Sequence, residues 1–150
     1  MKRFLWAALS TACIAILAPG CANSDRTSPA PVTTTNREGC PWPPSMDAVA
    51  AAPGNHRVLL ENDRVRVLDV TVAPGEREPV HAHCLPSVMY LMYEGRSRDY
   101  DAQGKLLSEI TESPPESQFP VTLWLEPQAP HSVENLDAKP LRLLRIELKP

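Results

Sequence analysis

The chain has 150 residues, enough for one domain, and a formal net charge of -3 with both signs mixed along its length. No basic stripe is present that could follow a phosphate backbone, and aromatic residues make up only 5% of the chain. These features argue against a nucleic-acid-binding protein.

Residues 1–21 have the order of a secretory signal peptide. Lys2 and Arg3 give a positive start, and residues 4–17 form an uncharged apolar run. This run is too short to span a bilayer comfortably, and the polar Ser-, Thr- and Pro-rich residues 22–38 behind it offer nothing to pack against. We therefore expect export of the chain, with residues 22–56 forming a flexible tether and a short lead-in to the folded part.

The end of this signal resembles the lipobox of bacterial lipoproteins, in which a cysteine becomes the lipidated first residue of the mature protein. Gly20 precedes Cys21 as in that motif, and Ala22 differs from the acidic residue of inner-membrane retention, whereas Ala18 and Pro19 depart from the usual pattern. The resemblance implies a lipid anchor on Cys21 at the membrane, on the periplasmic side of the outer membrane or elsewhere in the cell envelope. Ordinary cleavage and release is the alternative.

Export bears on the remaining cysteines. Cys13 lies within the signal peptide and Cys21 is the lipidation candidate, which leaves Cys40 and Cys84. In an oxidising compartment these two thiols can pair and hold the N-terminal segment to the folded part. Two separate thiols are the alternative.

The elements expected along the chain are a short helix and then a series of strands. The helix is predicted over residues 45–52, capped by Ser45 and stopped by Pro53 and Gly54. Apolar alternation and Gly, Pro and Asp turns predict strands at residues 57–60, 64–72, 79–83, 87–93, 96–100, 106–111, 121–125, 131–135 and 141–148. Short strands between proline-containing turns predict an all-β sandwich or closed barrel over residues 57–150.

Three histidines flank these strands. His81 and His83 are one residue apart, so on a strand both side chains point to the same face. An antiparallel barrel can bring His131 opposite this pair, whereas His56 is expected at the surface. We expect His81, His83 and His131 to bind a divalent metal ion (Zn, Fe, Mn, Ni or Cu) and to leave one position open.

The motif spacing resembles that of the cupin superfamily over about residues 57–148. The first cupin motif runs from a glycine through His-x-His and a glutamate to a second glycine, and the second motif contains a proline, a histidine and an asparagine. The residues of this chain that match are Gly75, His81, His83, Gly95, Pro127, His131 and Asn135. The resemblance implies a single jelly-roll β-barrel of the cupin type.

Two departures from the cupin pattern concern the metal site. The position of the usual glutamate ligand falls on Val88 or Ser87, and Gln128 stands where a glycine is usual. Glu94 lies at the strand end and is not taken as a substitute. The resemblance therefore implies a neutral three-histidine site like that of cupins without the glutamate, and a barrel that has lost its metal is the alternative.

The strand over residues 87–93 is expected to supply one pocket wall. If Val88 points inward, then alternation places Tyr90 and Met92 on the same face, and Trp124 is a further candidate for the wall. Core packing is the alternative for Tyr90 and Trp124. Cys84 is expected to point away from His83, as a disulfide or core residue.

The function expected is that of an exported, lipid-anchored small cupin that binds a divalent metal and a small molecule of unidentified structure. No clear general base appears in the predicted pocket, so the catalytic residues are unassigned and enzymatic activity is left open. A non-catalytic binding protein or an accessory envelope protein that has lost its metal is the alternative. Cupins resembling this chain are often homodimers, which makes self-association an expected partner interaction.

Overall fold

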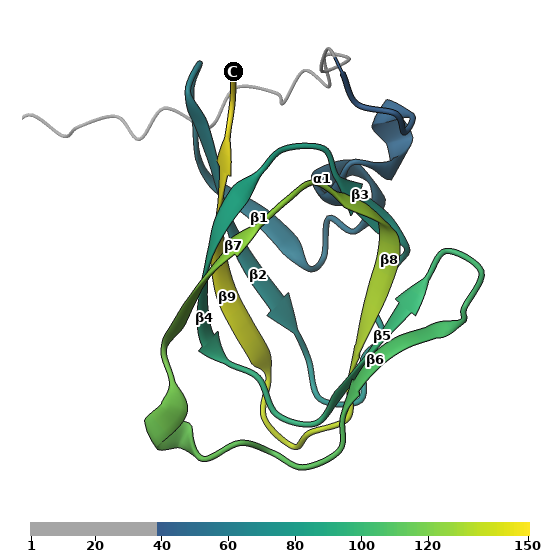
Figure 1. The fold of residues 1–150 in the computed structure, drawn as a ribbon, viewed down its shortest axis with the longest axis vertical. Coiled ribbons are helices and arrows are strands. Elements are labelled where there is room, and N and C mark those ends of the chain that lie inside the picture. The colour runs from purple at the N-terminus through teal and green to yellow at the C-terminus, as the bar shows by residue number, and fades with distance from the viewer. Residues whose placement is uncertain (1–38) are drawn as a thin grey trace, which may run out of the picture. The chain divides into compact units, whose positions relative to one another are not determined.

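The computed structural model describes residues 39–150. Within this part of the chain nine strands form two antiparallel sheets that face each other (Figure 1). The orders are β1-β2-β9-β4-β7 and β3-β8-β5-β6. The bounds are β1 His56–Glu61, β2 Val65–Val72, β3 His81–His83, β4 Ser87–Tyr93, β5 Ser97–Asp101, β6 Leu106–Ile110, β7 Val121–Leu125, β8 Gln128–Asn135 and β9 Leu141–Leu148.

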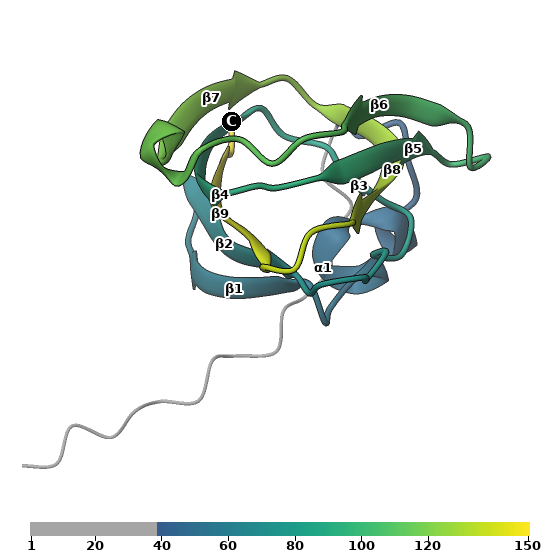
Figure 2. The same ribbon diagram turned by 90° about the horizontal axis from the view of Figure 1, so that it is seen from below.

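The two sheets curve around one interior, as the view in Figure 2 shows. The predicted all-β barrel is therefore confirmed, and each predicted strand has a counterpart. The main difference is at β8, which starts at Gln128 instead of His131 and runs through Pro130. This longer strand places Gln128 opposite His83 in the sheet.

The core lies between the sheets and is built by strict alternation along the strands. In β2 every second residue is buried, and the apolar members of this face are Leu68, Val70 and Val72. The same inner face carries charge at one end, where Arg66 of β2 lies beside Glu147 of β9. A buried charge needs a partner to offset its lost hydration, so this end of the core depends on ion pairing.

The segment that precedes the barrel is packed against it and is more than a lead-in. A 3₁₀ turn, η1 (Pro44–Met46), leads into the short helix α1 (Ala48–Ala51), which lies against β1 and β3. Asp47 and not Ser45 caps this helix, because Ser45 lies inside the 3₁₀ turn, and the Asp47 carboxylate accepts from Val49 N at 3.1 Å.

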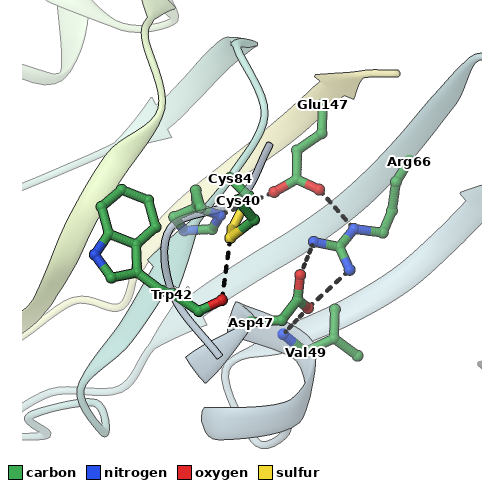
Figure 3. Close-up of a disulfide and its surroundings, with 8 residues drawn as sticks. Cys40, Trp42, Asp47, Val49, Arg66, Cys84 and Glu147 are labelled. Carbon is green, nitrogen blue, oxygen red and sulfur yellow. Dashed lines mark hydrogen bonds and ion pairs between the residues drawn. A yellow bond between two sulfur atoms is a disulfide. The ribbon is translucent and has the colours of Figure 1, made fainter. Parts of the chain in front are cut away.

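A disulfide holds this segment to the barrel. Cys40 and Cys84 are bonded, with Cα atoms 5.2 Å apart, so the structure forms the pairing that the sequence left open (Figure 3). Cys84 directly follows His83 at the end of β3. The bond therefore fixes the end of the strand that carries two of the histidines.

The two glycines of the first cupin-like motif are favoured at their positions for different structural reasons. Gly75 has φ of +75°, a left-handed conformation that residues with a Cβ rarely adopt. At Gly95 a Cβ would clash with the Asp137 side chain, so any larger residue there requires Asp137 to move.

The predicted signal peptide over residues 1–21 and the lipidation candidate Cys21 lie outside the described residues. Among residues 39–150, no helix has the length and apolar character needed to cross a membrane.

Candidate metal centre

The predicted histidines meet at one end of the barrel. His81 and His83 lie on β3 with both side chains fully buried, and β3 pairs with β8 so that His81 stands directly opposite His131. The ring centroid of His131 is 4.6 Å from that of His81 and 5.8 Å from that of His83. The expected approach of His131 to the His81 and His83 pair is confirmed.

His56 is a fourth member of the cluster, and its expected place at the surface is wrong. Its side chain is 3% exposed, and its ring centroid lies 4.5 Å from that of His81 and 5.4 Å from that of His83. The candidate ligand atoms of His56, His81 and His83 all lie within 4.8 Å of one another, and His131 borders this group at His81. His56 is turned inward at the start of β1, where its backbone N donates to O of Ala52, the C-cap residue of α1.

All four histidines use the same ring nitrogen for a hydrogen bond within the protein. The Nδ1 atom of His56 donates to Ala52 O (3.3 Å) and that of His81 donates to Pro79 O (2.9 Å). The Nδ1 atom of His83 donates to Glu147 Oε1 (2.9 Å) and that of His131 donates to Ala129 O (2.8 Å). Because carbonyl and carboxylate oxygens only accept, these contacts place the ring proton on Nδ1. Nε2 of each ring then keeps its lone pair for a metal ion.

The cluster is held in the neutral form that metal binding requires. Burial lowers the pKa of His56 to about 4 and that of His81 to about 3, and it also lowers the pKa values of His83 and His131. The guanidinium of Arg145 lowers all four pKa values further. At neutral pH these four imidazoles are uncharged.

A buried carboxylate positions one of the rings. Glu147 Oε1 accepts from His83 Nδ1, and Glu147 Oε2 accepts from Arg66 Nε at 2.6 Å. Arg66 in turn donates to both carboxylate oxygens of Asp47 at 2.8 and 2.9 Å (Figure 3). A carboxylate on the second nitrogen of a histidine is the usual outer partner of a metal ligand, because it fixes the ring and raises its basicity.

The histidines line a cavity of about 220 Å³ with different chemistry at its two ends. Along β8 the sheet register runs from Gln128, opposite His83, through His131 to Val133, opposite Asp99. Arg145 lines the cavity and contacts Gln128 at the first end, and Glu78 joins Asp99 at the other through its bond to Val133 N. The cluster therefore lies between an end that holds Arg145 with the Glu147 carboxylate and an end that holds Glu78 and Asp99.

Glu78 supplies a carboxyl group that the sequence did not single out. Its Oε1 lies 3.8 Å from His81 Nε2 and accepts from Val133 N at 3.1 Å, while Oε2 is buried with no hydrogen-bond partner among the described residues. Burial raises the pKa of Glu78 to about 8, so the group is mostly protonated at neutral pH. Its only signal in the sequence is its position three residues before His81.

The cavity wall contributed by β4 differs from the prediction. Met89 and Leu91 line the cavity, whereas Tyr90 and Trp124 are 40% and 54% exposed and Val88 and Met92 are half-buried on the same outer face. The predicted wall of Val88, Tyr90, Met92 and Trp124 is therefore wrong, because the alternation was counted from Val88. Tyr90 and Met92 instead line a separate depression of about 500 Å³ that contains no histidine.

Ser87 is the inward residue at the position of the cupin glutamate. It is fully buried, and its hydroxyl has no hydrogen-bond partner within residues 39–150. A hydroxyl is a poor replacement for a carboxylate ligand, so any metal bound here depends on the histidines.

No family model and no curated protein matches the chain. Among solved structures, a cupin domain from Bordetella pertussis Tohama I is 23% identical, with a TM-score of 0.50, and the match covers 63% of this chain and 92% of that one. An RmlC-like cupin family protein from Methanocaldococcus jannaschii, described as having a double-stranded β-helix fold, is 11% identical, with a TM-score of 0.45 and coverage of 63% and 78%. Together with the two facing antiparallel sheets, the first of these similarities shows that the chain has the cupin fold, with a histidine group positioned to bind metal.

Proposed function

We propose that the protein binds a divalent transition-metal ion through histidine Nε2 atoms inside the barrel. The observation that carries this proposal is the shared use of Nδ1 in four neutral imidazoles, three of them buried and that of His131 half-buried, which leaves four lone pairs in one cluster. His56, His81 and His83 form the closest group, and His131 is available beside His81. Imidazole suits Zn, Cu, Fe and Ni, and the donor set does not select one of them.

The residues around the cluster fit a site that also accepts a small molecule. A bound ion would act there as a Lewis acid toward a ligand in the cavity. Glu147 holds the ring of His83, and Glu78 carries a proton next to His81 at neutral pH. Glu78 is thus the candidate proton donor or acceptor if the protein is an enzyme.

A metal-free binding protein is the second candidate function. The observation in its favour is Ser87, which stands at the position of the cupin glutamate and removes one ligand and one negative charge. In this case the polar cavity would hold a small organic molecule without an ion.

The proposal includes the location of the protein. Export to the cell envelope and a lipid anchor on Cys21 are supported by the signal-like residues 1–21. The disulfide between Cys40 and Cys84 is consistent with an oxidising compartment. We also propose self-association through β7, an edge strand whose Leu123 and Trp124 are exposed, with the mass of the purified protein in solution as its test.

The metal content of the purified protein tests the proposed function. We expect near-stoichiometric metal by elemental mass spectrometry when the protein is prepared without chelators or affinity nickel. Replacing His81 and His83 together by Ala should abolish metal retention and preserve the β-sheet circular dichroism spectrum. Tyr90→Phe, on the outer face, is the matched control and should keep its metal. A wild-type protein that takes up none of Zn, Fe, Mn, Ni or Cu would favour the metal-free binding protein.

A mass measurement on the envelope fraction tests the anchor. The N-terminal peptide should begin at Cys21 and carry acyl chains, and Cys21→Ser should release the protein into the soluble fraction. An unmodified soluble wild-type protein would show ordinary cleavage instead.

A further inference from the structure

We infer that Arg145 recognises a carboxylate group on the small molecule held in the cavity. This inference rests on the proposed function and adds the chemical class of the ligand. It is carried by two unpartnered guanidinium nitrogens on a buried side chain that lines the same cavity as the histidines.

The free nitrogens of Arg145 lie on one edge of its guanidinium. Nη1 donates to Gln128 Oε1 at 2.5 Å, whereas Nε and Nη2 are buried and have no hydrogen-bond partner in the described part of the chain. Nε–H and Nη2–H are parallel donors on the side of the planar group. This is the fork that matches the two oxygens of a carboxylate.

A second buried arginine shows how the protein treats a guanidinium whose role is structural. Arg66 donates to Glu147 through Nε and to both oxygens of Asp47 through Nη1 and Nη2. Arg145 occupies the same inner face, but its cross-strand neighbours are Leu68 and Met89, which offer no side-chain acceptor. Leaving buried charged donors unpaired is costly, so the free edge of Arg145 indicates an acceptor that comes from outside the chain.

The second departure from the cupin motif now has a structural role. Gln128 replaces the usual glycine, and its amide oxygen holds Nη1 of Arg145. Since β8 begins at Gln128 and pairs it with His83, the residue that orients Arg145 belongs to the same ladder as the histidines. Gln128 is therefore a positioning residue for Arg145.

Charge and size also favour a small anion at this end of the cavity. Four neutral imidazoles contribute no charge, and the positive charges of Arg66 and Arg145 are balanced by Glu147 and Asp47, so the excess positive charge near Gln128 is that of a bound divalent ion. The acidic groups Glu78, Glu94 and Asp99 line the cavity as well, and Glu78 and Asp99 lie at its opposite end along β8. A volume of about 220 Å³ admits a small carboxylic acid and excludes a drug-sized ligand.

The test uses zinc-loaded wild-type protein titrated with sodium acetate, with neutral acetamide as the isosteric control and inorganic phosphate as a tetrahedral anion. The Arg145 Nε–H signal in ¹H–¹⁵N NMR reports the contact directly. We expect acetate to shift this signal with saturation and acetamide to leave it unchanged. Because two oxygens of a phosphate also match the guanidinium fork, a phosphate affinity equal to or above that of acetate would show a site for oxyanions in general and would overturn the assignment of a carboxylate.

Two variants separate recognition by Arg145 from coordination by the ion. Arg145→Met should retain its zinc and bind acetate about 10- to 100-fold more weakly by isothermal titration calorimetry, because two charge-assisted hydrogen bonds are lost. Arg145→Lys keeps the positive charge but lacks the two parallel N–H donors of the guanidinium, so it should also weaken acetate binding. It replaces Arg145→Met in the test if Arg145→Met does not fold. Equal acetate affinity in the variants, or equal binding of acetate and acetamide, would overturn the inference.

The same NMR titration on chelator-treated protein distinguishes this inference from the proposed metal site. A saturable acetate shift at Arg145 in a protein that takes up no metal would refute the metal site and keep the carboxylate site. Retained zinc without any acetate shift would refute the carboxylate site alone.

Discussion

Replacing Glu147 by Gln tests whether the buried carboxylate positions His83 for metal binding. Glu147 is fully buried and accepts from two donors, His83 Nδ1 at 2.9 Å and Arg66 Nε at 2.6 Å. A glutamine at this position has a single acceptor oxygen, so its NH₂ group must face one of the two donors. We expect weaker metal binding and a less stable protein from the same substitution.

The sizes of the two effects follow from the contacts. Loss of an outer carboxylate partner typically lowers metal affinity by about 10- to 100-fold. Breaking a buried ion pair costs about 3–5 kcal/mol, and because Arg66 keeps both bonds to Asp47 we expect the lower end, about 3 kcal/mol. For a domain of this size that loss lowers the melting temperature by roughly 10–15 °C.

Asp47→Asn is the matched control, because Asp47 contacts Arg66 at the far side of the same network and makes no hydrogen bond to His83. We expect it to reduce stability by about 3 kcal/mol as well, because it also disrupts a buried ion pair of Arg66, and to leave metal affinity within about twofold of wild type. Metal affinity is measured by competition with a chromophoric chelator and stability by thermal melts of the metal-free proteins. Unchanged metal affinity in Glu147→Gln, or an equal loss in Asp47→Asn, would refute a specific role for Glu147 at His83.

Two further predictions concern stability. Replacing Cys40 and Cys84 by Ser opens a covalent loop with a sequence separation of 44, and the chain-entropy relation gives a loss of about 4 kcal/mol in the free energy of unfolding. Urea unfolding should show this loss in the wild type when reductant is added, and reductant should have no effect on the variant. The metal-free protein should also lose stability as pH falls from 6.5 toward 4. The pKa values of His56 and His81 are lowered to about 4 and about 3, so the unfolded chain binds protons there that the folded chain does not. Glu78 has the opposite effect. Its pKa is raised to about 8, so its contribution to stability falls as pH rises from 4.5 to 8. A melting temperature that stays flat between pH 4.5 and 6.5 in EDTA would contradict the buried neutral histidines.

The strands could be predicted because their period is local. Along β2 the residues alternate in character, and the structure shows the matching alternation of burial. The adjacency of His83 and Cys84 likewise predicted that Cys84 is a disulfide or core residue, and in the structure His83 lines the cavity while Cys84 forms a disulfide. These inferences need only the two-residue repeat of a strand.

The phase of a strand and its partners across the barrel could not be predicted in the same way. Counting from Val88 instead of Ser87 moved every pocket residue of β4 to the wrong face, because a shift of one residue reverses a strand. His56 was missed because its inward direction is set by α1. Arg145 and Glu147 belong to no motif in the sequence, and only the register of β9 against β2 and β4 places them inside.

The position of the disulfide makes the candidate site sensitive to where the chain folds. Strand β3 spans only His81–His83, and the residue that follows it is covalently joined to the segment before α1. A chain held back in a reducing compartment would lack this link next to His83. Under the proposed function, maturation of the centre would then follow oxidation, and a reduced copy of the chain would acquire its ion poorly.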